Sequence, residues 1–354
     1  MKGNEALAEA AIRAGCTAYF GYPITPQNEI PAYMSLHMLK KGRIFIQAES
    51  EVAAINMVFG ASAAGARAMT SSSSPGISLK QEGISYAAGA DIPCVVANVS
   101  RGGPGLGSIA PAQGDYFQST RGGGHGDYFT LVLAPKSVQE CADFTYLAFD
   151  LADKYRTPVI VLADGMIGQM MEGVLLPPEK ALADLPKRPW KVGHMAGTKD
   201  AKGATRKAIH ISSINLVPAE LEAKTKARFE RYEEIKKNEV RYEEADVAGS
   251  EIILTAYGTC ARVSMGAKKL AEKEGIKVGI FRPISLWPFP YEALGKAAGK
   301  GKPILSVEMS LGQLIEDVRL SVLGNCPVHL LGHTGGVIPT EEEVFAEIKK
   351  ILRK

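Results

Sequence analysis

The sequence has few cysteines and no closely spaced pair of them. Only five occur among 354 residues, and none forms a C-x-x-C unit. An odd, scattered set argues against a disulfide framework and fits a reducing cytoplasm. An iron–sulfur cluster needs closely spaced thiolates, so we expect none to be held by this chain. The five residues, Cys16, Cys94, Cys141, Cys260 and Cys326, are expected to be buried apolar side chains.

Long apolar runs and an excess of one charge are missing as well. No run reaches the roughly 20 residues that span a bilayer, and the N-terminus shows no secretory leader. The 41 basic and 38 acidic residues are interleaved and leave a net charge of only +3. This balance by itself argues neither for nor against binding to nucleic acid or membranes. Because the sequence also shows no basic stripe, no membrane-spanning run and no leader, we expect a cytoplasmic protein without a membrane or nucleic-acid partner.

Several common catalytic motifs are absent. The chain has no G-x-G-x-x-G, no P-loop sequence and no G-x-S-x-G elbow. It also lacks H-x-x-H and H-E-x-x-H, so we expect no metal site made by this chain alone. These absences argue against a dinucleotide-binding, P-loop or α/β-hydrolase enzyme.

Helix-like and strand-like segments do alternate along residues 1–165. Helices are predicted at 4–14, 50–65, 76–89 and 137–154, and another from Pro26 with Thr25 as its N-cap. Strands are predicted at 17–21, 44–47, 67–71, 94–99, 131–134 and 158–163. Strands separated by helices imply an α/β fold with a parallel sheet covered on both faces.

The rest of the chain divides into two parts. Residues 166–250 break the alternation, and 218–244 is dense in Lys, Arg and Glu, which predicts an exposed connector helix. The alternation resumes from residue 251 and continues to 354. We therefore expect a second, smaller α/β domain there.

Unusual residues follow four of the predicted strands. They are 22–26 after the first strand, Glu49 and Glu51 after the second, 71–75 after the third and 101–107 after the fourth. In parallel sheets ligands bind beyond the carboxyl ends of the strands. These segments are therefore expected to converge on one site.

Each of these residues also has a plain structural explanation. Glu51 opens a helix rich in Ala and Gly, where a carboxylate could serve a ligand or only the helix dipole, and Glu49 is equally ambiguous. The hydroxyl-rich turn 71–76 could bind an anion or cap a helix. Arg101 could clamp a carboxylate or form a salt bridge. His125, between glycines, could be an acid, a base or a loop residue.

In combination these motifs resemble the 2-oxoacid:ferredoxin oxidoreductases. The run 21–26 resembles their Y-P-I-T-P signature, and the Glu51 helix through Arg67 looks like their pyrimidine-binding segment. The segments 71–76, 101–105 and 125–127 follow in the family's order, and 257–259 is similar to its transketolase C-terminal-like domain. Segments 71–82 and 109–113 most resemble alpha subunits of the branched-chain type, which use 2-oxoisovalerate. The 2-oxoglutarate enzymes share most motifs and stay open as an alternative.

The resemblance implies an architecture and a reaction. It implies a thiamine-diphosphate pyrimidine-binding domain at 1–165, a connector with a charged helix at 166–250 and a transketolase C-terminal-like domain at 251–354. The reaction is the oxidative decarboxylation of a 2-oxoacid, in which coenzyme A takes the acyl group, carbon dioxide leaves and ferredoxin takes the electrons.

The resemblance also assigns site residues. It implies that Glu51 is the catalytic carboxylate, which forms a hydrogen bond with the pyrimidine ring. It also implies that Thr25 and Arg101 bind the carboxylate of the substrate. The implied cofactor-binding residues are Tyr22, Pro23, Ile24, Glu51, Ser73, Ser74 and Pro75. Glu49 does not align with a family position.

One family element is missing from the sequence. Thiamine enzymes hold magnesium and the diphosphate with G-D-G and a later asparagine, whereas this chain offers only Gly114-Asp115-Tyr116 and Gly126-Asp127-Tyr128. A beta subunit should therefore carry the diphosphate and Mg²⁺, and a gamma or iron–sulfur subunit should pass electrons to ferredoxin. The missing motif argues against a self-sufficient transketolase-like enzyme. The intact Glu51, Thr25 and Arg101 argue against a non-catalytic binding module.

Overall fold

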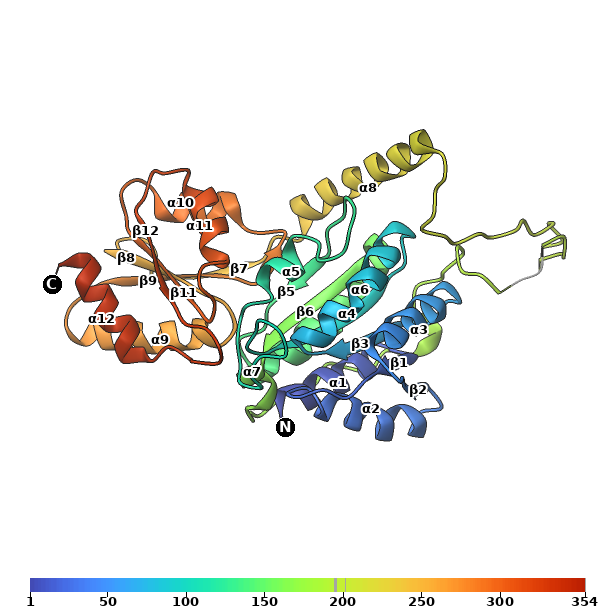
Figure 1. Cartoon of the computed structure of the whole chain (residues 1–354), viewed down its shortest axis with the longest axis horizontal. Coiled ribbons are helices and arrows are strands. Elements are labelled where there is room, and N and C mark those ends of the chain that lie inside the picture. The colour runs from blue at the N-terminus through green and yellow to red at the C-terminus, as the bar shows by residue number, and fades with distance from the viewer. Residues whose placement is uncertain (194–195, 201, 354) are drawn as a thin grey trace.

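The computed structural model describes residues 1–193, 196–200 and 202–353, which fold into two α/β units (Figure 1). The first sheet has the strand order β10-β5-β6-β4-β3-β1-β2. Its strands are β1 (Ala18–Gly21), β2 (Ile44–Gln47), β3 (Ala68–Ser72), β4 (Cys94–Ser100), β5 (Leu131–Leu133), β6 (Pro158–Asp164) and β10 (Ser285–Trp287). Strand β10 runs antiparallel to β5, and the other neighbours are parallel.

Helices cover both faces of this sheet. They are α1 (Gly3–Arg13), α2 (Glu29–Lys40), α3 (Glu51–Ala63), α4 (Ser74–Gly89), α5 (Tyr116–Thr120), α6 (Val138–Tyr155) and α7 (Gly165–Gln169). The direction of the chain across the sheet reverses after β2, because β3 pairs on the far side of β1. Right-handed crossovers then put α3 and α4 on the face opposite α2 and α6. The reversal between β1 and β3 is where open α/β sheets bind ligands.

The second sheet has the order β12-β11-β8-β9-β7. Its strands are β7 (Tyr242–Ala245), β8 (Ile252–Thr255), β9 (Val278–Pro283), β11 (Ile304–Glu308) and β12 (Val328–Gly332), with β7 antiparallel to β9. The remaining helices are the short η1 (Leu182–Asp184), α8 (Pro218–Asn238), α9 (Gly258–Lys273), α10 (Tyr291–Ala298), α11 (Leu314–Val322) and α12 (Glu341–Leu352). No helix in the described ranges is long and apolar enough to cross a membrane.

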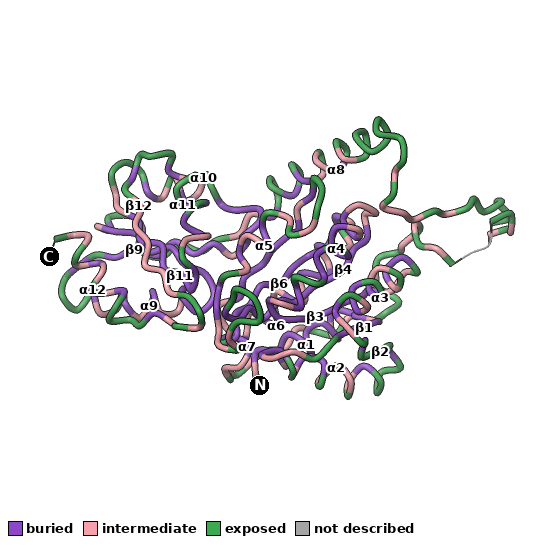
Figure 2. Tube along the Cα trace, viewed as in Figure 1, coloured by how far each residue is buried: buried purple, intermediate pink, exposed green. Residues whose placement is uncertain are grey.

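Burial follows the predicted pattern of a covered parallel sheet. Strands β3, β4 and β6 are buried along their whole length, whereas β2 at the edge and most of the charged helix α8 are exposed (Figure 2). A single apolar core joins the first sheet and its helices and continues into the second unit through residues such as Ile253 and Phe281. The two units therefore pack directly against one another.

The structure departs from the sequence-based expectations in two places. Helix α2 starts at Glu29 with Asn28 as its N-cap, so the prediction of a helix from Pro26 capped by Thr25 was wrong. The carbonyl groups of Thr25 and Pro26 instead accept hydrogen bonds from the side chains of Arg101 and Asn4. The segment is a loop because its carbonyls bond to side chains and not to helix amides.

The second departure concerns two short edge strands. β7 lies within the range expected to be connector, yet it pairs with the second sheet. β10 lies within 251–354, yet it completes the edge of the first sheet. Short antiparallel strands commonly cover the edges of parallel sheets. Such pairing depends on tertiary contacts, which the periodicity of the sequence does not carry.

Candidate functional site

The predicted site segments end four neighbouring strands of the first sheet. Strands β2, β1, β3 and β4 are adjacent, and the chain leaves them at Gln47, Gly21, Ser72 and Ser100. Since the four strands are parallel, the segments that follow them lie at one edge of the sheet. This arrangement brings residues from 22–25, 49–51, 73–75 and 101 to a single edge, at the reversal of strand order.

Glu51 is a buried carboxylate at the first position of α3. Ser50 caps this helix by accepting a hydrogen bond from the Ala53 amide at 3.2 Å, which fixes the start of the helix and the place of Glu51. The Glu51 side chain is 5% exposed. No described residue donates a hydrogen bond to its carboxylate. A buried carboxylate is costly without a donor, so a donor from outside the chain would be favoured here.

Gly76 lets helix α4 approach that carboxylate. A Cβ atom at position 76 would lie 2.5 Å from Oε1 of Glu51 and 2.1 Å from Oγ of Ser72. Only glycine therefore fits between the first turn of α4 and the Glu51 side chain. The small-residue character of this region thus has a direct steric cause.

Lys80 lies one turn further along the same face of α4 and is fully buried. Its Nζ donates a hydrogen bond to the Glu51 carbonyl oxygen at 3.3 Å. Burial lowers the pKa of Lys80 from 10.5 to about 8, and the negative charge of Glu51 opposes that shift. Sequence reasoning missed this residue, although a lysine between Ile77 and Ile84 stands on the apolar stripe of the helix.

This burial predicts a pH-dependent stability. The unfolded chain keeps the Lys80 proton up to a pKa of 10.5, whereas the folded chain releases it near pH 8. The free energy of unfolding should therefore rise with pH between these values, by about 1.4 kcal/mol for each pH unit. We expect Lys80→Met, whose methionine carries no charge, to be more stable than the wild type at pH 7. That advantage should shrink by roughly 2 kcal/mol at pH 9.5.

Chemical unfolding of the wild type and of Lys80→Met at pH 7 and pH 9.5 measures this effect. Lys40→Met is the matched control, because Lys40 is exposed near the end of α2. That variant should differ from the wild type by the same small amount at both pH values. A constant difference between Lys80→Met and the wild type would show that Lys80 does not titrate in this range.

The turn into α4 is tied to the loop after β4. The Ser74 hydroxyl donates a hydrogen bond to Asp115 at 2.6 Å and accepts one from the Arg101 amide at 2.9 Å. Asn98 donates a further bond to Asp115 at 2.8 Å. Burial raises the pKa of Asp115, while the bonds from Ser74 and Asn98 lower it. Asp115 belongs to the Gly114–Tyr116 run, which the sequence analysis considered only as an incomplete magnesium motif.

Arg101 and Thr25 meet at the edge of the sheet. The Arg101 guanidinium donates to the carbonyl oxygen of Thr25 at 2.8 Å and to that of Leu106 at 3.0 Å. These two bonds use two of its five N–H groups, and the side chain is 5% exposed. The Thr25 hydroxyl accepts a bond from Asn28 at 3.3 Å. Arg101 therefore holds the loop after β1 in place and keeps further donors.

The second unit forms hydrogen bonds with the loop that follows β4 and carries Arg101 and Asp115. Gln113 donates from its amide side chain to the Tyr257 carbonyl at 2.8 Å and accepts from the Met309 amide at 3.1 Å. Asp164 caps α7 and also accepts from the Thr259 amide at the start of α9, at 2.8 Å. Buried polar contacts of this kind fix the relative position of the two units.

We expect Gln113→Ala to lower the free energy of unfolding by roughly 1–3 kcal/mol, because it leaves the Met309 amide buried without its partner and removes one of the two donors to the Tyr257 carbonyl, the other being the Ala261 amide. Denaturant unfolding of the full chain measures the change. Gln118→Ala is the control, because that side chain is only half-buried and bonds to Ser78 within the first unit. Equal effects of the two substitutions would contradict the bracing role of Gln113.

The other predicted cofactor residues differ in burial. Tyr22 and Pro23 are exposed, while Ile24 and Pro75 are half-buried. Ser73 is buried and its hydroxyl has no hydrogen-bond partner among the described residues, as is also true of Ser72. Glu49 is exposed. This edge of the sheet therefore has exposed side chains at Tyr22 and Pro23. It also has buried hydroxyl groups at Ser72 and Ser73 that could still form hydrogen bonds.

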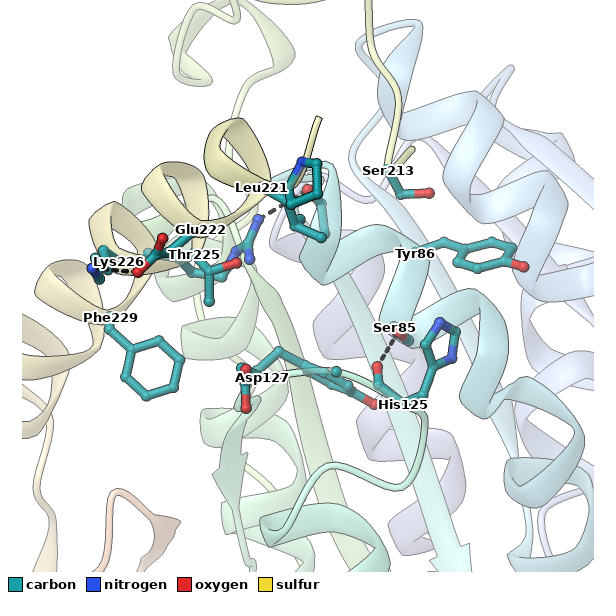
Figure 3. A pocket seen from close by; sticks show the side chains of 15 residues that line it. Ser85, Tyr86, His125, Asp127, Ser213, Leu221, Glu222, Thr225, Lys226 and Phe229 are labelled. Atoms are coloured by element: carbon teal, nitrogen blue, oxygen red, sulfur yellow. Dashed lines mark hydrogen bonds and ion pairs between the residues drawn. The ribbon is translucent and has the colours of Figure 1, made fainter. Parts of the chain in front are cut away.

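His125 lies apart from these residues, on a cavity of about 820 Å³ between α4, the 125–128 loop and α8 (Figure 3). The His125 ring stands edge-on to Tyr86, with centroids 6.4 Å apart, and its carbonyl oxygen accepts a bond from Ser85. Glu51, Thr25 and Arg101 do not line this cavity. The position of His125 therefore gives no support to an acid or base role beside Glu51.

In the described ranges, no group of three or more His, Cys, Asp or Glu side chains is arranged to hold a metal ion. All five cysteines are free and buried, as predicted. Burial raises the pKa of Cys16 and of Cys94 to about 12, so both remain protonated thiols near neutral pH.

Comparison with known families assigns both units. Residues 9–246 match the family described as pyruvate flavodoxin/ferredoxin oxidoreductase, thiamine diphosphate-binding. Residues 250–344 match pyruvate:ferredoxin oxidoreductase core domain II. The two matches cover nearly the whole chain, and their boundary falls between β7 and β8.

Two curated relatives match over nearly their full length. Ketoisovalerate oxidoreductase subunit VorB of Methanothermobacter thermautotrophicus is 49% identical over 351 residues, which is 99% of this chain and 97% of the relative. The 2-oxoglutarate synthase subunit KorA of Archaeoglobus fulgidus is 38% identical, over 97% of this chain and 96% of the relative.

Solved structures share the fold. The 2-oxoglutarate:ferredoxin oxidoreductase of Magnetococcus marinus, solved with 2-oxoglutarate, coenzyme A and succinyl-CoA bound, superposes with a TM-score of 0.83 at 28% identity. The match covers 99% of this chain and 64% of that chain. A split-gene transketolase superposes with a TM-score of 0.61 at 14% identity, which is a likeness of fold alone.

Proposed function

Because this chain belongs to the 2-oxoacid:ferredoxin oxidoreductase family, we propose that it binds the pyrimidine ring of thiamine diphosphate through Glu51, as one subunit of a 2-oxoacid-oxidising complex. The enzyme would convert a 2-oxoacid, coenzyme A and oxidised ferredoxin into an acyl-CoA, carbon dioxide and reduced ferredoxin. The observation that carries the assignment is the buried Glu51 carboxylate, which no described residue supplies with a hydrogen bond.

The residues at the site fit a flat, nitrogen-containing ring. Glu51 offers an acceptor for a ring N–H, and Ser72 and Ser73 offer buried hydroxyl groups without partners. Gly76 keeps the space beside the carboxylate clear of a Cβ atom. Tyr22 and Pro23 present exposed surfaces that such a ring could contact. The pyrimidine of thiamine has both the N–H donor and the flat faces that this set would bind.

Each residue can be given a role toward that ring and the substrate. When bound, thiamine diphosphate supplies the nucleophilic carbon and the electron sink for decarboxylation. Glu51 would hold a proton at a nitrogen of the bound pyrimidine ring. Tyr22, Pro23, Ile24, Ser73, Ser74 and Pro75 form the wall of the ring site. Arg101 and Thr25 bind the substrate carboxylate, with Arg101 using the N–H groups that its two backbone bonds leave.

The remaining parts of the enzyme are assigned to other subunits. The chain lacks the G-D-G motif, so the diphosphate and Mg²⁺ would lie on a beta subunit that covers Glu51. Its cysteines are buried and scattered, so iron–sulfur clusters would lie on a gamma or iron–sulfur subunit that reduces ferredoxin. The naming of the relatives as subunits supports a multi-subunit assembly. A cytoplasmic location stays a prediction.

The proposed substrate is 2-oxoisovalerate. The support is the 49% identity to a ketoisovalerate oxidoreductase subunit over both full lengths, against 38% for a 2-oxoglutarate relative. 2-Oxoglutarate is the second candidate, because the relatives of that class match nearly as much of the chain. The two substrates differ by a second carboxylate, so charge within the assembled pocket would distinguish them.

The test is a viologen- or ferredoxin-linked assay of the native complex, with coenzyme A and several 2-oxoacids. We expect the highest kcat/KM with 2-oxoisovalerate. A preference for 2-oxoglutarate or pyruvate would support the proposed reaction but contradict 2-oxoisovalerate as the substrate. No turnover with any 2-oxoacid, from a complex that holds thiamine diphosphate and iron–sulfur clusters, would overturn the proposed function.

A further inference from the structure

Three buried polar side chains form a hydrogen-bonded network behind the loop that follows β1. The Tyr19 hydroxyl and the Ser71 hydroxyl lie 2.6 Å apart, and Ser71 donates to Oε1 of Gln27 at 2.5 Å. Nε2 of Gln27 then donates to the carbonyl oxygen of Tyr22 at 3.1 Å. Tyr19, Ser71 and Gln27 are all 0% exposed, whereas Tyr22 is exposed. The network therefore runs from the core of the first unit to the loop at the proposed ring site.

The chemistry of these groups fixes the direction of each bond. The side-chain oxygen of Gln27 can only accept, so the single hydroxyl proton of Ser71 is used there. The Tyr19 hydroxyl must then donate to Ser71. Turning the Gln27 amide around would place its oxygen against the Tyr22 carbonyl oxygen. The network thus holds the Gln27 N–H toward Tyr22.

Gln27 binds the loop through its backbone as well. Its amide N–H donates to the Ile24 carbonyl at 3.0 Å, so it holds residues 22–24 at both ends. The next residue of the loop is held differently, since the Thr25 carbonyl accepts a bond from Arg101 at 2.8 Å. The part of the loop that carries Tyr22, Pro23 and Ile24 therefore depends on Gln27.

Packing alone does not explain an amide at position 27. Methionine has a similar length and volume and would fill the same space without polar atoms. Burying an amide group beside two hydroxyl groups has a desolvation cost, which hydrogen bonds offset only when each group finds a partner. A network that meets this condition favours one arrangement of the groups that it joins. Here the group at its end is the backbone of the loop.

We propose that Gln27 is a positioning residue that fixes the backbone of residues 22–24 and so shapes the wall of the pyrimidine site. The inference rests on the function proposed above, in which Tyr22, Pro23 and Ile24 contact the ring. Gln27 is buried beneath the loop and acts through the Tyr22 and Ile24 carbonyls. A loop that is already held in its binding conformation loses less conformational entropy when a ligand binds.

Gln27→Met is expected to weaken the binding of thiamine diphosphate with Mg²⁺ to the native complex by roughly 10- to 100-fold. The KM for the 2-oxoacid, measured at saturating cofactor, should stay within about twofold of the wild-type value, because uniform substrate binding is unchanged. The reason is that Arg101 still holds Thr25. Titration calorimetry measures the cofactor affinity, and a viologen-linked assay measures KM.

Ser71→Ala tests the same network with a smaller change. It leaves the bond from Gln27 to Tyr22 but removes the hydroxyl that orients the Gln27 amide. We expect a loss of cofactor affinity in the same direction as for Gln27→Met, and smaller. This variant gives the answer if Gln27→Met does not assemble with its partner subunits.

Ser62→Ala is the matched control for lost stability. Ser62 is fully buried in the same unit and donates to the Pro93 carbonyl at 2.6 Å. Pro93 directly precedes β4, so this bond lies at the edge of the sheet opposite the proposed site. We expect Ser62→Ala to lose stability in denaturant unfolding and to keep the wild-type affinity for thiamine diphosphate.

The outcomes distinguish this inference from the proposed function. A cofactor affinity in Gln27→Met and Ser71→Ala no weaker than in Ser62→Ala would show that Gln27 only supports the fold. A rise in KM as large as the loss of cofactor affinity would show a general disturbance of the site. Either result would overturn the inference and leave the proposed function standing. A wild-type complex that does not bind thiamine diphosphate would overturn the proposed function, and the inference with it.

Discussion

The Glu51→Gln variant is expected to assemble with its partners and to lose turnover by about 10²- to 10⁴-fold, the range typical of a lost proton-holding group. Glutamine keeps the size and shape of the side chain, so Gly76 and Ser50 retain their contacts with the start of α3. The variant loses the negative charge that would hold a proton on the ring nitrogen. Steady-state kcat of the native complex, with size-exclusion chromatography to verify assembly, measures the effect.

Glu49 provides the matched control for this substitution. It lies two residues before Glu51 but is exposed, and among the described residues its carboxylate accepts a hydrogen bond only from the neighbouring Ser50. We expect Glu49→Gln to keep near-normal turnover. Near-normal turnover of Glu51→Gln, or equal losses in both variants, would contradict the role assigned to Glu51.

The regular part of the fold was open to prediction from the sequence. The parallel strands and their helices are recognisable from the sequence, because central strands such as β4 are mostly apolar and helices such as α6 have one buried face. Apart from the start of α2, the elements predicted within residues 1–165 agree with the structure to within one or two residues. Sequence order alone also predicted that 22–25, 49–51, 73–75 and 101 meet at the ends of neighbouring strands.

What escaped prediction depends on contacts between distant residues. The loop at Pro26 looked like the start of a helix, because its carbonyl partners Asn4 and Arg101 lie far away in the sequence. The edge strand β10 pairs with β5 across more than 150 residues. Lys80 was not singled out, because its burial and its bond to the Glu51 carbonyl depend on the packing of α4 against α3. In each case the local pattern was consistent with two structures, and tertiary packing selected one.

The site residues show the same division. Glu51 and Arg101 were singled out from residue type and position and Thr25 from the family resemblance, and the structure places all three at one edge of the sheet. Asp115 was considered only as part of an incomplete magnesium motif, because its bonds to Ser74 and Asn98 have no local sequence signal. The bracing by Gln113 also required the second unit to be in place.

Arg101→Ala is expected to lower kcat/KM for a 2-oxoacid by roughly 10²- to 10³-fold, because truncating one partner of a buried, hydrogen-bonded ion pair costs several kcal/mol. Arg101→Lys should recover only part of the loss, since an ammonium group cannot bond a carboxylate and two carbonyls in the same planar geometry. The guanidinium also bonds the carbonyls of Thr25 and Leu106, so the substitution could act by releasing those loops.

Measuring KM and the affinity for thiamine diphosphate in the same variants separates these two causes. If Arg101 binds the substrate carboxylate, KM rises in Arg101→Ala while the cofactor affinity stays near that of the wild type. If Arg101 only anchors the loop at Thr25, the cofactor affinity falls as well, because Tyr22, Pro23 and Ile24 belong to that loop. An unchanged KM with weaker cofactor binding would therefore reassign Arg101 from the substrate to the loop that forms the wall of the ring site.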